Sequence, residues 1–314
     1  MNALGALLLV LVFPGFAFTF AFAMVFAWID RKVTARVQWR VGPPFLQPVY
    51  DFIKLLGKEV IVPAGGARVL FLLAPLLGLA AVTVSSTLVW QGNIWPEKGF
   101  VGDLIVVIYL LTIPSLSVIL GGLASNNRVA SLGASREMKM ILSYELPLVL
   151  ALVVPIINAD NSIRLGEMLQ SQPAVWHVSG ILAFMVAIIC MQAKLGLVPF
   201  DIAEAETEVM GGPFVEYSGA PLAIIKLTRS MMLFLMPVFL VTVFWGGITG
   251  GGGIVGTVLG CLKVLLLLVI VILLRNTNPR VRIDQAVGFF WGPWVTGVAL
   301  LAVALALLRN VIWA

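Results

Sequence analysis

Five carboxylates lie close together in a chain that otherwise carries few charges. They occur within PFDIAEAETEVMGGPFVEYSG, residues 199–219, and are Asp201, Glu204, Glu206, Glu208 and Glu216. Only 11% of the 314 residues are charged, so this density is a local feature. Because an ionised side chain at the centre of a bilayer costs roughly 2.5–3.5 kcal/mol on insertion scales, such a group must face protein or water. Carboxylates gathered in this way at a membrane surface indicate proton handling.

The spacing of this segment predicts one helical face for three of its acids. Pro199 is able to begin a helical turn. Asp201, Glu204 and Glu208 then follow at i, i+3 and i+7, while Glu206 points elsewhere. Mutual repulsion would make the group titrate as a coupled set. A solvated acidic loop is the alternative, against which the helical spacing and the apolar flanks count.

Two further carboxylates are expected at the start of a membrane span. Glu137 and Glu145 lie in GASREMKMILSYELP, residues 133–147. In a helix they are separated by roughly 80° around the axis and roughly 12 Å along it. Glu137 could be a solvated acid at a helix start, where carboxylates are favoured. Glu145 lies deeper, and apolar surroundings that disfavour its charged form would let it take and release protons, unless its role is structural.

A basic segment between residues 30 and 59 predicts a structured membrane surface. Arg36 and Arg40 are four residues apart and share a helical face, and the sequence Gly-Pro-Pro at 42–44 then breaks the chain. Residues 46–60 place apolar side chains on one stripe, which predicts an interfacial amphipathic helix. A plain membrane anchor would explain the charges but not the rigid turns.

The composition places the chain among polytopic helical membrane proteins. Hydrophobic residues make up 61% of it, the mean hydropathy is +1.06, and apolar runs of about 20 residues recur. The expected fold is an all-α bundle forming a single membrane domain, 1–314, with an acidic cytoplasmic loop at about 198–217. The eight predicted spans are 3–28, 68–90, 104–124, 138–158, 175–197, 218–245, 254–275 and 286–312.

The distribution of basic residues predicts the topology. Most of the 20 Lys and Arg fall in the loops after spans one, three, five and seven. By the positive-inside rule these loops face the cytoplasm, so both termini of this multi-pass protein of the cytoplasmic membrane face outward. The net charge of +5 is then explained by topology, and nucleic-acid binding is not indicated.

The chain lacks the residues to hold a metal cofactor of its own. Cys190 and Cys261 are isolated in apolar spans, and His177 is the only histidine. Any iron–sulfur, nickel or haem centre is therefore expected in partner subunits. Lys226 and Arg229 could neutralise the acidic segment or extend to the surface. Lys263 lies well inside span seven and is assigned to the same proton-handling group, with extension to the surface as its alternative.

Four segments, taken together, resemble the eight-helix membrane subunit shared by respiratory complex I, where it is the H subunit, and the energy-converting [NiFe] hydrogenases. They are DRKVTARVQWRVGP with LQPVYDFIKLLGKE, then LASNNRVASLGASREMKMILSYE, then PFDIAEAETEVMGGPFVEYSG, and finally NPRVRIDQ at 278–285. They follow the family's order from span one to span eight, so the resemblance covers essentially the whole chain.

The resemblance implies a membrane anchor beneath a peripheral electron-transfer arm, with a proton path and no catalytic residue in this chain. The residues assigned to the entrance of that path are Asp201, Glu204, Glu206 and Glu208, with Glu216 beside them. Glu137 and Glu145 would continue it into the membrane, toward antiporter-like partners. The residues assigned to the interface with the arm are Arg31, Arg36, Arg40, Arg280, Arg282 and Asp284.

Details of the sequence within these segments favour the hydrogenase branch of the family. The stretch GPPFLQP at 42–48 is shorter than is usual in complex I, and GASRE and AEAETE also look hydrogenase-like. The expected function is the proton-conducting anchor of a ferredoxin-linked [NiFe] hydrogenase-type complex. Its partners would be hydrogenase-like large and small subunits, an iron–sulfur subunit and antiporter-like membrane subunits, which would hold the iron–sulfur clusters and a [NiFe] centre.

Three alternatives stay open. The chain could be the quinone-site membrane subunit of complex I, or the corresponding subunit of a membrane-bound sulfane reductase. It could also be a stand-alone ion transporter, although no inverted internal repeat is visible.

Overall fold

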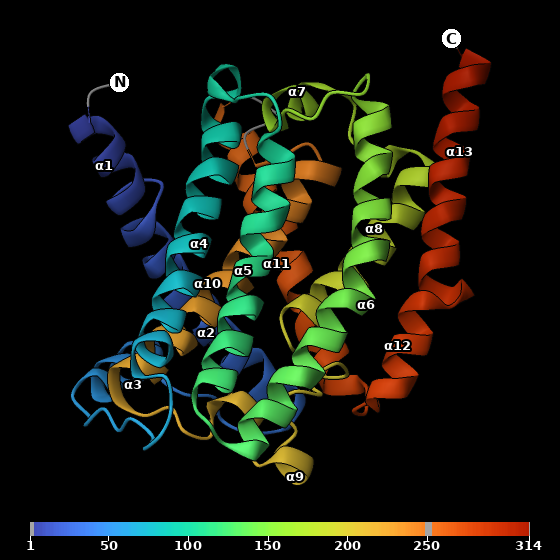
Figure 1. The fold of residues 1–314 in the computed structure, drawn as a ribbon. Helices are drawn as coiled ribbons and strands as arrows, with labels where there is room; N and C mark the ends of the chain where they lie inside the picture. Colours follow the sequence, from blue (N-terminus) through green and yellow to red (C-terminus); the bar gives the residue numbers. More distant parts are fainter. Residues whose placement is uncertain (1–2, 249–252, 314) are drawn as a thin grey trace.

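The computed structural model describes residues 3–248 and 253–313, and every regular element in these residues is a helix (Figure 1). The predicted all-α membrane bundle is confirmed. Within the described residues, seven helical segments are long and apolar enough to span a membrane, and α8 is a shorter apolar helix. The helices are α1 (Ala3–Leu11), α2 (Phe16–Val37), α3 (Gln47–Leu56), α4 (Arg68–Ile94), α5 (Asp103–Ala124), α6 (Arg128–Asn158), α7 (Leu165–Gln170), α8 (Val178–Lys194), α9 (Glu206–Val209), α10 (Gly219–Phe244), α11 (Gly253–Thr277), α12 (Ile283–Trp291) and α13 (Val298–Trp313).

Several predicted spans have different boundaries in the structure, and the last, expected at 286–312, is α12 and α13 with a π-helical turn, Pro293–Gly297, between them. The span expected at 3–28 is two helices, α1 and α2, separated at residues 12–15, where Pro14 lacks an N–H for a helical hydrogen bond. Helix α2 then continues to Val37. The span expected from residue 138 begins at Arg128, where the Asn127 side chain caps α6 by accepting a 2.8 Å hydrogen bond from the Val129 N–H. Polar helix ends therefore extend the apolar segments that hydropathy detects.

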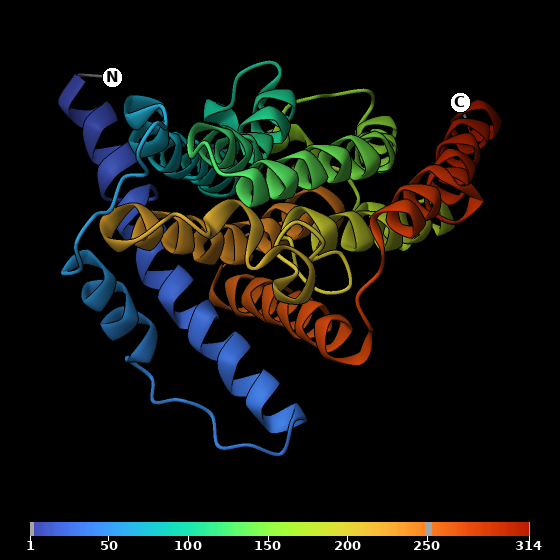
Figure 2. The same cartoon turned by 60° about the horizontal axis from the view of Figure 1, so that its bottom comes forward.

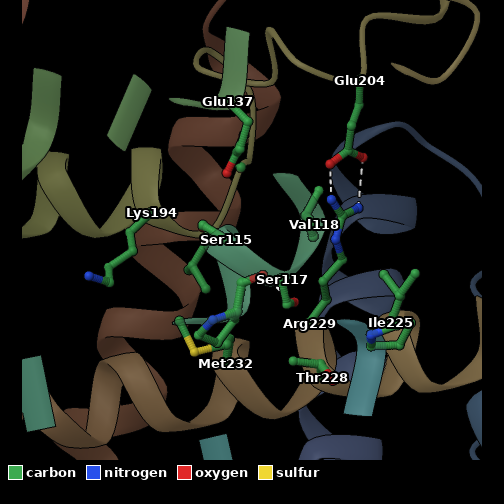
Figure 3. Close-up of a pocket in the computed structure, with 14 residues that line it drawn as sticks. Ser115, Ser117, Val118, Glu137, Lys194, Glu204, Ile225, Thr228, Arg229 and Met232 are labelled. Atoms are coloured by element: carbon green, nitrogen blue, oxygen red, sulfur yellow. Dashed lines mark hydrogen bonds and ion pairs between the residues drawn. The ribbon is translucent and has the colours of Figure 1, made fainter. Parts of the chain in front are cut away.

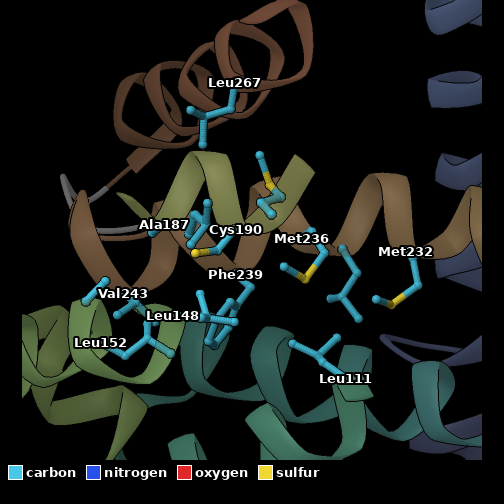
Figure 4. Close-up of a cluster of buried hydrophobic side chains, with 14 of the residues drawn as sticks. Leu111, Leu148, Leu152, Ala187, Cys190, Met232, Met236, Phe239, Val243 and Leu267 are labelled. Carbon is cyan, nitrogen blue, oxygen red and sulfur yellow. The ribbon is translucent and has the colours of Figure 1, made fainter. Parts of the chain in front are cut away.

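Helix α10 is the centre of the bundle. Figure 2 shows it between a layer of α4, α5 and α6 and the pair α2 and α11. Leu240 and Phe244 have no exposed surface, and Figure 4 shows Phe239 and Met236 among side chains of the surrounding helices. Lipid tails are as apolar as this core, so close van der Waals packing, rather than the exclusion of water, stabilises the contact.

The predicted amphipathic helix is confirmed as α3, which ends at Leu56. It packs on α2 and α10, with Val49 and Phe52 turned toward the core and Ile53 exposed. Arg31 of α2 binds Asp51 of α3 at 2.6 Å, and this hydrogen bond lowers the pKa of Asp51.

The two ends of the bundle differ in what they carry. The start of α1 and the end of α13 lie at one end, which we call the terminal end (Figure 1). The opposite end carries α3, α9 and the carboxylate segment 198–217, and we call it the acidic end.

Candidate functional site

The carboxylate segment is not a continuous helix. Residues 201–205 form turns and irregular backbone, and only Glu206–Val209 is helical, as α9. The predicted common face of Asp201, Glu204 and Glu208 is therefore wrong. The apolar side chains between these acids are buried, for example Ile202 and Ala203, so packing against the bundle overrides the helical spacing.

Each of these acids pairs with an arginine from a different element. Asp201 binds Arg280 at 2.8 Å, Glu204 binds Arg229 of α10 at 2.7 Å, and Glu208 binds Arg136 of α6 at 2.5 Å. A fourth pair joins Asp30 of α2 to Arg275 of α11 at 2.8 Å. The acids are thus separated and neutralised by arginines, so repulsion among them is not the main electrostatic effect. Of the two cations expected either to neutralise the segment or to extend to the surface, Arg229 pairs with Glu204.

Asp201 lies in a partly buried environment that affects its ionisation. Burial raises its pKa above the ordinary value, and the positive charges of Arg280 and Arg229 oppose that shift. One of its oxygens, Oδ1, is buried and has no hydrogen-bond partner among the described residues. An unpaired buried oxygen of this kind suits a bound water or a proton.

A cavity of about 430 Å³ opens at the acidic end between α2, α10, α11 and the carboxylate segment. Its charged lining residues are Asp30, Arg31, Asp201, Glu204, Lys226, Arg229, Arg275 and Arg280. Small organic ligands usually occupy mainly apolar pockets, whereas about half of the residues that line this cavity are charged. The cavity therefore suits water and ions.

A second cavity, of about 50 Å³, lies next to the first, and the two share Glu204 and Arg229 in their walls. Glu137 of α6, Ser115 of α5 and Lys194 of α8 also line it (Figure 3). Glu137 is therefore turned into the bundle, and its alternative interpretation as a solvated helix-start acid does not fit.

Polar groups continue from the small cavity along α6. Ser115 lies beside both the Glu137 carboxylate and the Tyr144 hydroxyl. The Lys194 ammonium lies 5.7 Å from the centre of the Tyr144 ring, and Glu145 is the carboxylate that attracts it. We call these five residues the inner polar row.

Lys194 is a member of this row that sequence reasoning missed. Although span five was expected to extend over 175–197, Lys194 was counted with the basic residues of the loop that follows this span. Helix α8 has only 17 residues and ends at Lys194, within the bundle. The local signal was weak: Gly196, which adopts a positive φ of 61° that favours glycine, follows two residues later.

Other predicted site residues lie apart from the two cavities. Glu206 is exposed on α9, and Glu216 accepts a 2.5 Å hydrogen bond from the Asn127 amide. The Lys263 ammonium donates to the Trp245 carbonyl at 2.9 Å, near the end of α10 at the terminal end. The structure does not bring Lys263 together with the carboxylates.

The predicted interface residues form an exposed surface at the acidic end. Arg36, Arg40, Arg282 and Asp284 are exposed, whereas Arg31 and Arg280 are held in ion pairs. Trp39 and Val41, which sequence reasoning did not single out, are 98% and 97% exposed beside Arg40. A fully exposed indole between two arginines is typical of a protein interface.

Within residues 3–248 and 253–313, no group of three or more His, Cys, Asp or Glu side chains is placed to hold a metal ion.

Known proteins resemble this chain over most of its length. The sequence profile of the NADH dehydrogenase family matches residues 8–307. The NADH-quinone oxidoreductase H subunit of Thermomicrobium roseum is 38% identical over 290 residues, which are 84% of this chain and 84% of that protein. The corresponding H subunit of Brevibacillus brevis is 36% identical over 301 residues, 92% of this chain and 87% of that protein.

A solved structure has the same fold. It is a chain of the membrane-bound sulfane sulfur reductase, an archaeal respiratory membrane complex. The TM-score is 0.84 at 27% sequence identity, and the match covers 96% of this chain and 99% of that one. From the sequence profile and these relatives, the chain belongs to the NADH dehydrogenase family, as a membrane protein of the same type as the H subunit of complex I.

Proposed function

We propose that this chain is the proton-conducting membrane subunit of a complex I-type respiratory complex that reduces a quinone. The two bacterial relatives named above are H subunits of NADH-quinone oxidoreductases, so they support the quinone alternative better than the expected hydrogenase. Iron–sulfur clusters and the primary electron-transfer chemistry then belong to partner subunits. The acidic end faces the cytoplasm in this proposal, and both termini face outward.

One observation carries the proton-conducting role. The large cavity, the small cavity and the inner polar row follow one another from the acidic end into the bundle, with Glu204 and Arg229 shared by the two cavities. Water in the large cavity would bring protons to Asp201 and Glu204. Glu137 would receive them inside the bundle, and Glu145 would be the last carboxylate of the row. Positioned acids and bases of this kind typically contribute 10²–10⁴-fold to a proton-transfer rate.

The exposed surface at the acidic end would dock the peripheral arm. Arg36 and Arg40 would supply charge, and Trp39 and Val41 an apolar centre that is otherwise left in water. The same surface lies beside a cavity of about 280 Å³ lined by Gly42, Pro43 and Arg40. A docked arm would reduce the electron acceptor next to this cavity.

A sulfur-reducing complex is the second candidate, because a solved sulfane sulfur reductase chain matches this fold from end to end. The two candidates differ in their electron acceptor and share the proposed proton path. Reduction of a short-chain quinone or of polysulfide by the purified complex separates them. Nickel in that complex would instead support the hydrogenase expectation.

Glu137→Gln tests the proton path. The intact complex is placed in sealed vesicles, and acidification is measured per electron transferred at matched complex abundance. Glu137→Gln should lower this ratio by about tenfold or more, because the amide cannot exchange the proton. Glu206→Gln, on the exposed surface of α9, is the control and should pump normally. Normal pumping by Glu137→Gln would contradict the proposed path.

A further inference from the structure

Lys194 is a buried basic residue that the carboxylate path does not require. Its exposed fraction is 5%. Its ammonium makes no hydrogen bond or ion pair of ordinary length with a described residue, and its nearest aromatic contact is the Tyr144 ring at 5.7 Å. Burying an ammonium without a close partner is costly, so an ionisable residue at this depth is a functional hypothesis by default.

The position of Lys194 along the bundle follows from its contact with α6. Tyr144 lies sixteen residues after Arg128, which is roughly 24 Å along a helix of roughly 45 Å. Lys194 is therefore near the middle of the bundle, although it is the last residue of its helix. Helix α8 approaches from the terminal end and stops there, and the loop that follows it leads into the carboxylate segment.

The charged and titratable groups around Lys194 come from three helices. Helix α6 contributes Glu137, Tyr144 and Glu145, and α8 itself contributes Cys190. Arg229 of α10 lines the same small cavity but is paired with Glu204. Helix α13 contributes only Arg309, which acts on His177 near the terminal end. Glu145 is thus the carboxylate whose charge acts on Lys194, and Glu137, which is in no ion pair with an arginine among the described residues, lines the same small cavity.

The backbone positions of those two carboxylates are well separated. Eight helical residues separate them by roughly 12 Å along the axis and roughly 80° around it. Tyr144 lies seven residues after Glu137, on nearly the same face, and Lys194 lies over its ring. Figure 3 shows the Lys194 side chain directed away from Arg229, on the far side of Glu137 and Ser115. The flexible Lys194 side chain therefore lies in the inner polar row between its two carboxylates.

We propose that Lys194 carries protons between Glu137 and Glu145, and does not act only as a fixed counter-charge. This inference rests on the proposed function. In the first step the Lys194 ammonium gives a proton to the Glu145 carboxylate and becomes a neutral amine. In the second step the amine accepts the proton of a protonated Glu137. Lys194 is then an ammonium again, Glu145 is a neutral acid, Glu137 is a carboxylate, and no electron has moved.

Two substitutions of Lys194 distinguish a role of its positive charge from a role in proton transfer. Lys194→Met removes both, and Lys194→Arg keeps the positive charge but does not release a proton, because a guanidinium stays protonated in proteins. Acidification per electron is measured for the intact complex in sealed vesicles. Both variants should lose about tenfold or more. Lys263→Met and Lys263→Arg are matched controls within a membrane helix and should pump normally, because the Lys263 ammonium donates to the Trp245 carbonyl, far from the carboxylates.

The outcomes for Lys194 and for the carboxylates are distinguishable. Wild-type pumping by Lys194→Arg would overturn the inference, because a counter-charge would then suffice. If Glu137→Gln loses pumping while Lys194→Arg pumps normally, only the inference about Lys194 is contradicted and the carboxylate path stands. If Glu137→Gln pumps normally, the proposed function itself falls.

A second measurement covers the case in which arginine does not fit the buried site. Lys194→Ala extends the small cavity, and added ethylamine is able to replace the missing amine. Pumping restored by ethylamine but not by ethylguanidinium would support proton transfer through a releasable proton. Equal restoration by both ions, or restoration by neither, would contradict it.

Discussion

The first turns of α10 and the rest of that helix have different surroundings. Lys226, Thr228 and Arg229 line the cavities at the acidic end. From Met231 to Phe244 every residue is buried, and nearly all of them are apolar. The end of α10 at the terminal end makes neutral contacts instead: the Asn93 amide donates to Thr242 at 2.8 Å, and its carbonyl accepts from the Ile248 N–H at 3.0 Å.

The difference indicates how far a proton could travel within this chain. Ionisable groups follow one another from the acidic end as far as Glu145, and beyond it α6 continues as LPLVLALVVPIIN, with no ionisable side chain. Under the proposed function, a proton leaves the bundle sideways near Glu145, toward a membrane partner. The acidic end would then carry out proton transfer, and packing at the terminal end would stabilise the bundle.

Glu145→Gln should have the largest effect and should affect function alone. The amide keeps the size and polarity of the side chain but removes the exchangeable acid. Acidification per electron in vesicles should fall by an order of magnitude or more, and up to about 10²–10⁴-fold. Complex abundance and electron transfer to artificial acceptors by the detached arm should be unchanged. Wild-type pumping at matched abundance would return Glu145 to a structural role.

Leu240→Ala should have the opposite pattern. Leu240 is fully buried in α10, so the substitution leaves a cavity and should destabilise the protein by about 2–5 kcal/mol. Complex abundance and thermal stability in detergent should fall, while pumping per assembled complex stays normal. Leu301→Ala is the matched control. The Leu301 side chain on α13 is 53% exposed, so its loss should change stability little. Equal losses for both would mean that the terminal end is not held by its core.

Sequence reasoning succeeded where the relevant interactions are local. Hydropathy located the spans, and helical periodicity placed Glu137 and Glu145 correctly on one helix. It failed where distant segments meet. The arginines that separate Asp201 from Glu204 come from the segment after α11 and from α10, and no local spacing predicts such pairs. Lys194 was missed because its helix stops inside the bundle, which depends on the packing of the loop that follows.

Reversal of charge at Arg36 and Arg40 tests the docking surface of the acidic end. Arg36→Glu with Arg40→Glu should weaken attachment of the peripheral arm by about tenfold or more, since like charges at an interface cost several kcal/mol. Co-purification of the arm at rising salt concentration measures this. Lys98→Glu with Arg164→Glu makes the same charge change near the terminal end and should leave the arm attached. An arm that stays bound after the first change would favour a simple lipid anchor.

Asp51→Asn should have the smallest effect, although it breaks an ion pair of the acidic end. Arg31 and Asp51 are 44% and 41% exposed, and pairs this open to solvent contribute about 0–1 kcal/mol. The hydrogen bond from Arg31 lowers the pKa of Asp51 below its unfolded value, so the pair stabilises the fold above that value. The contribution is lost as the pH falls through the lowered pKa. Thermal melting of wild type and Asp51→Asn should therefore differ slightly at neutral pH and converge in acid. A large difference at neutral pH would mean that ion pairs of the acidic end also hold the bundle together.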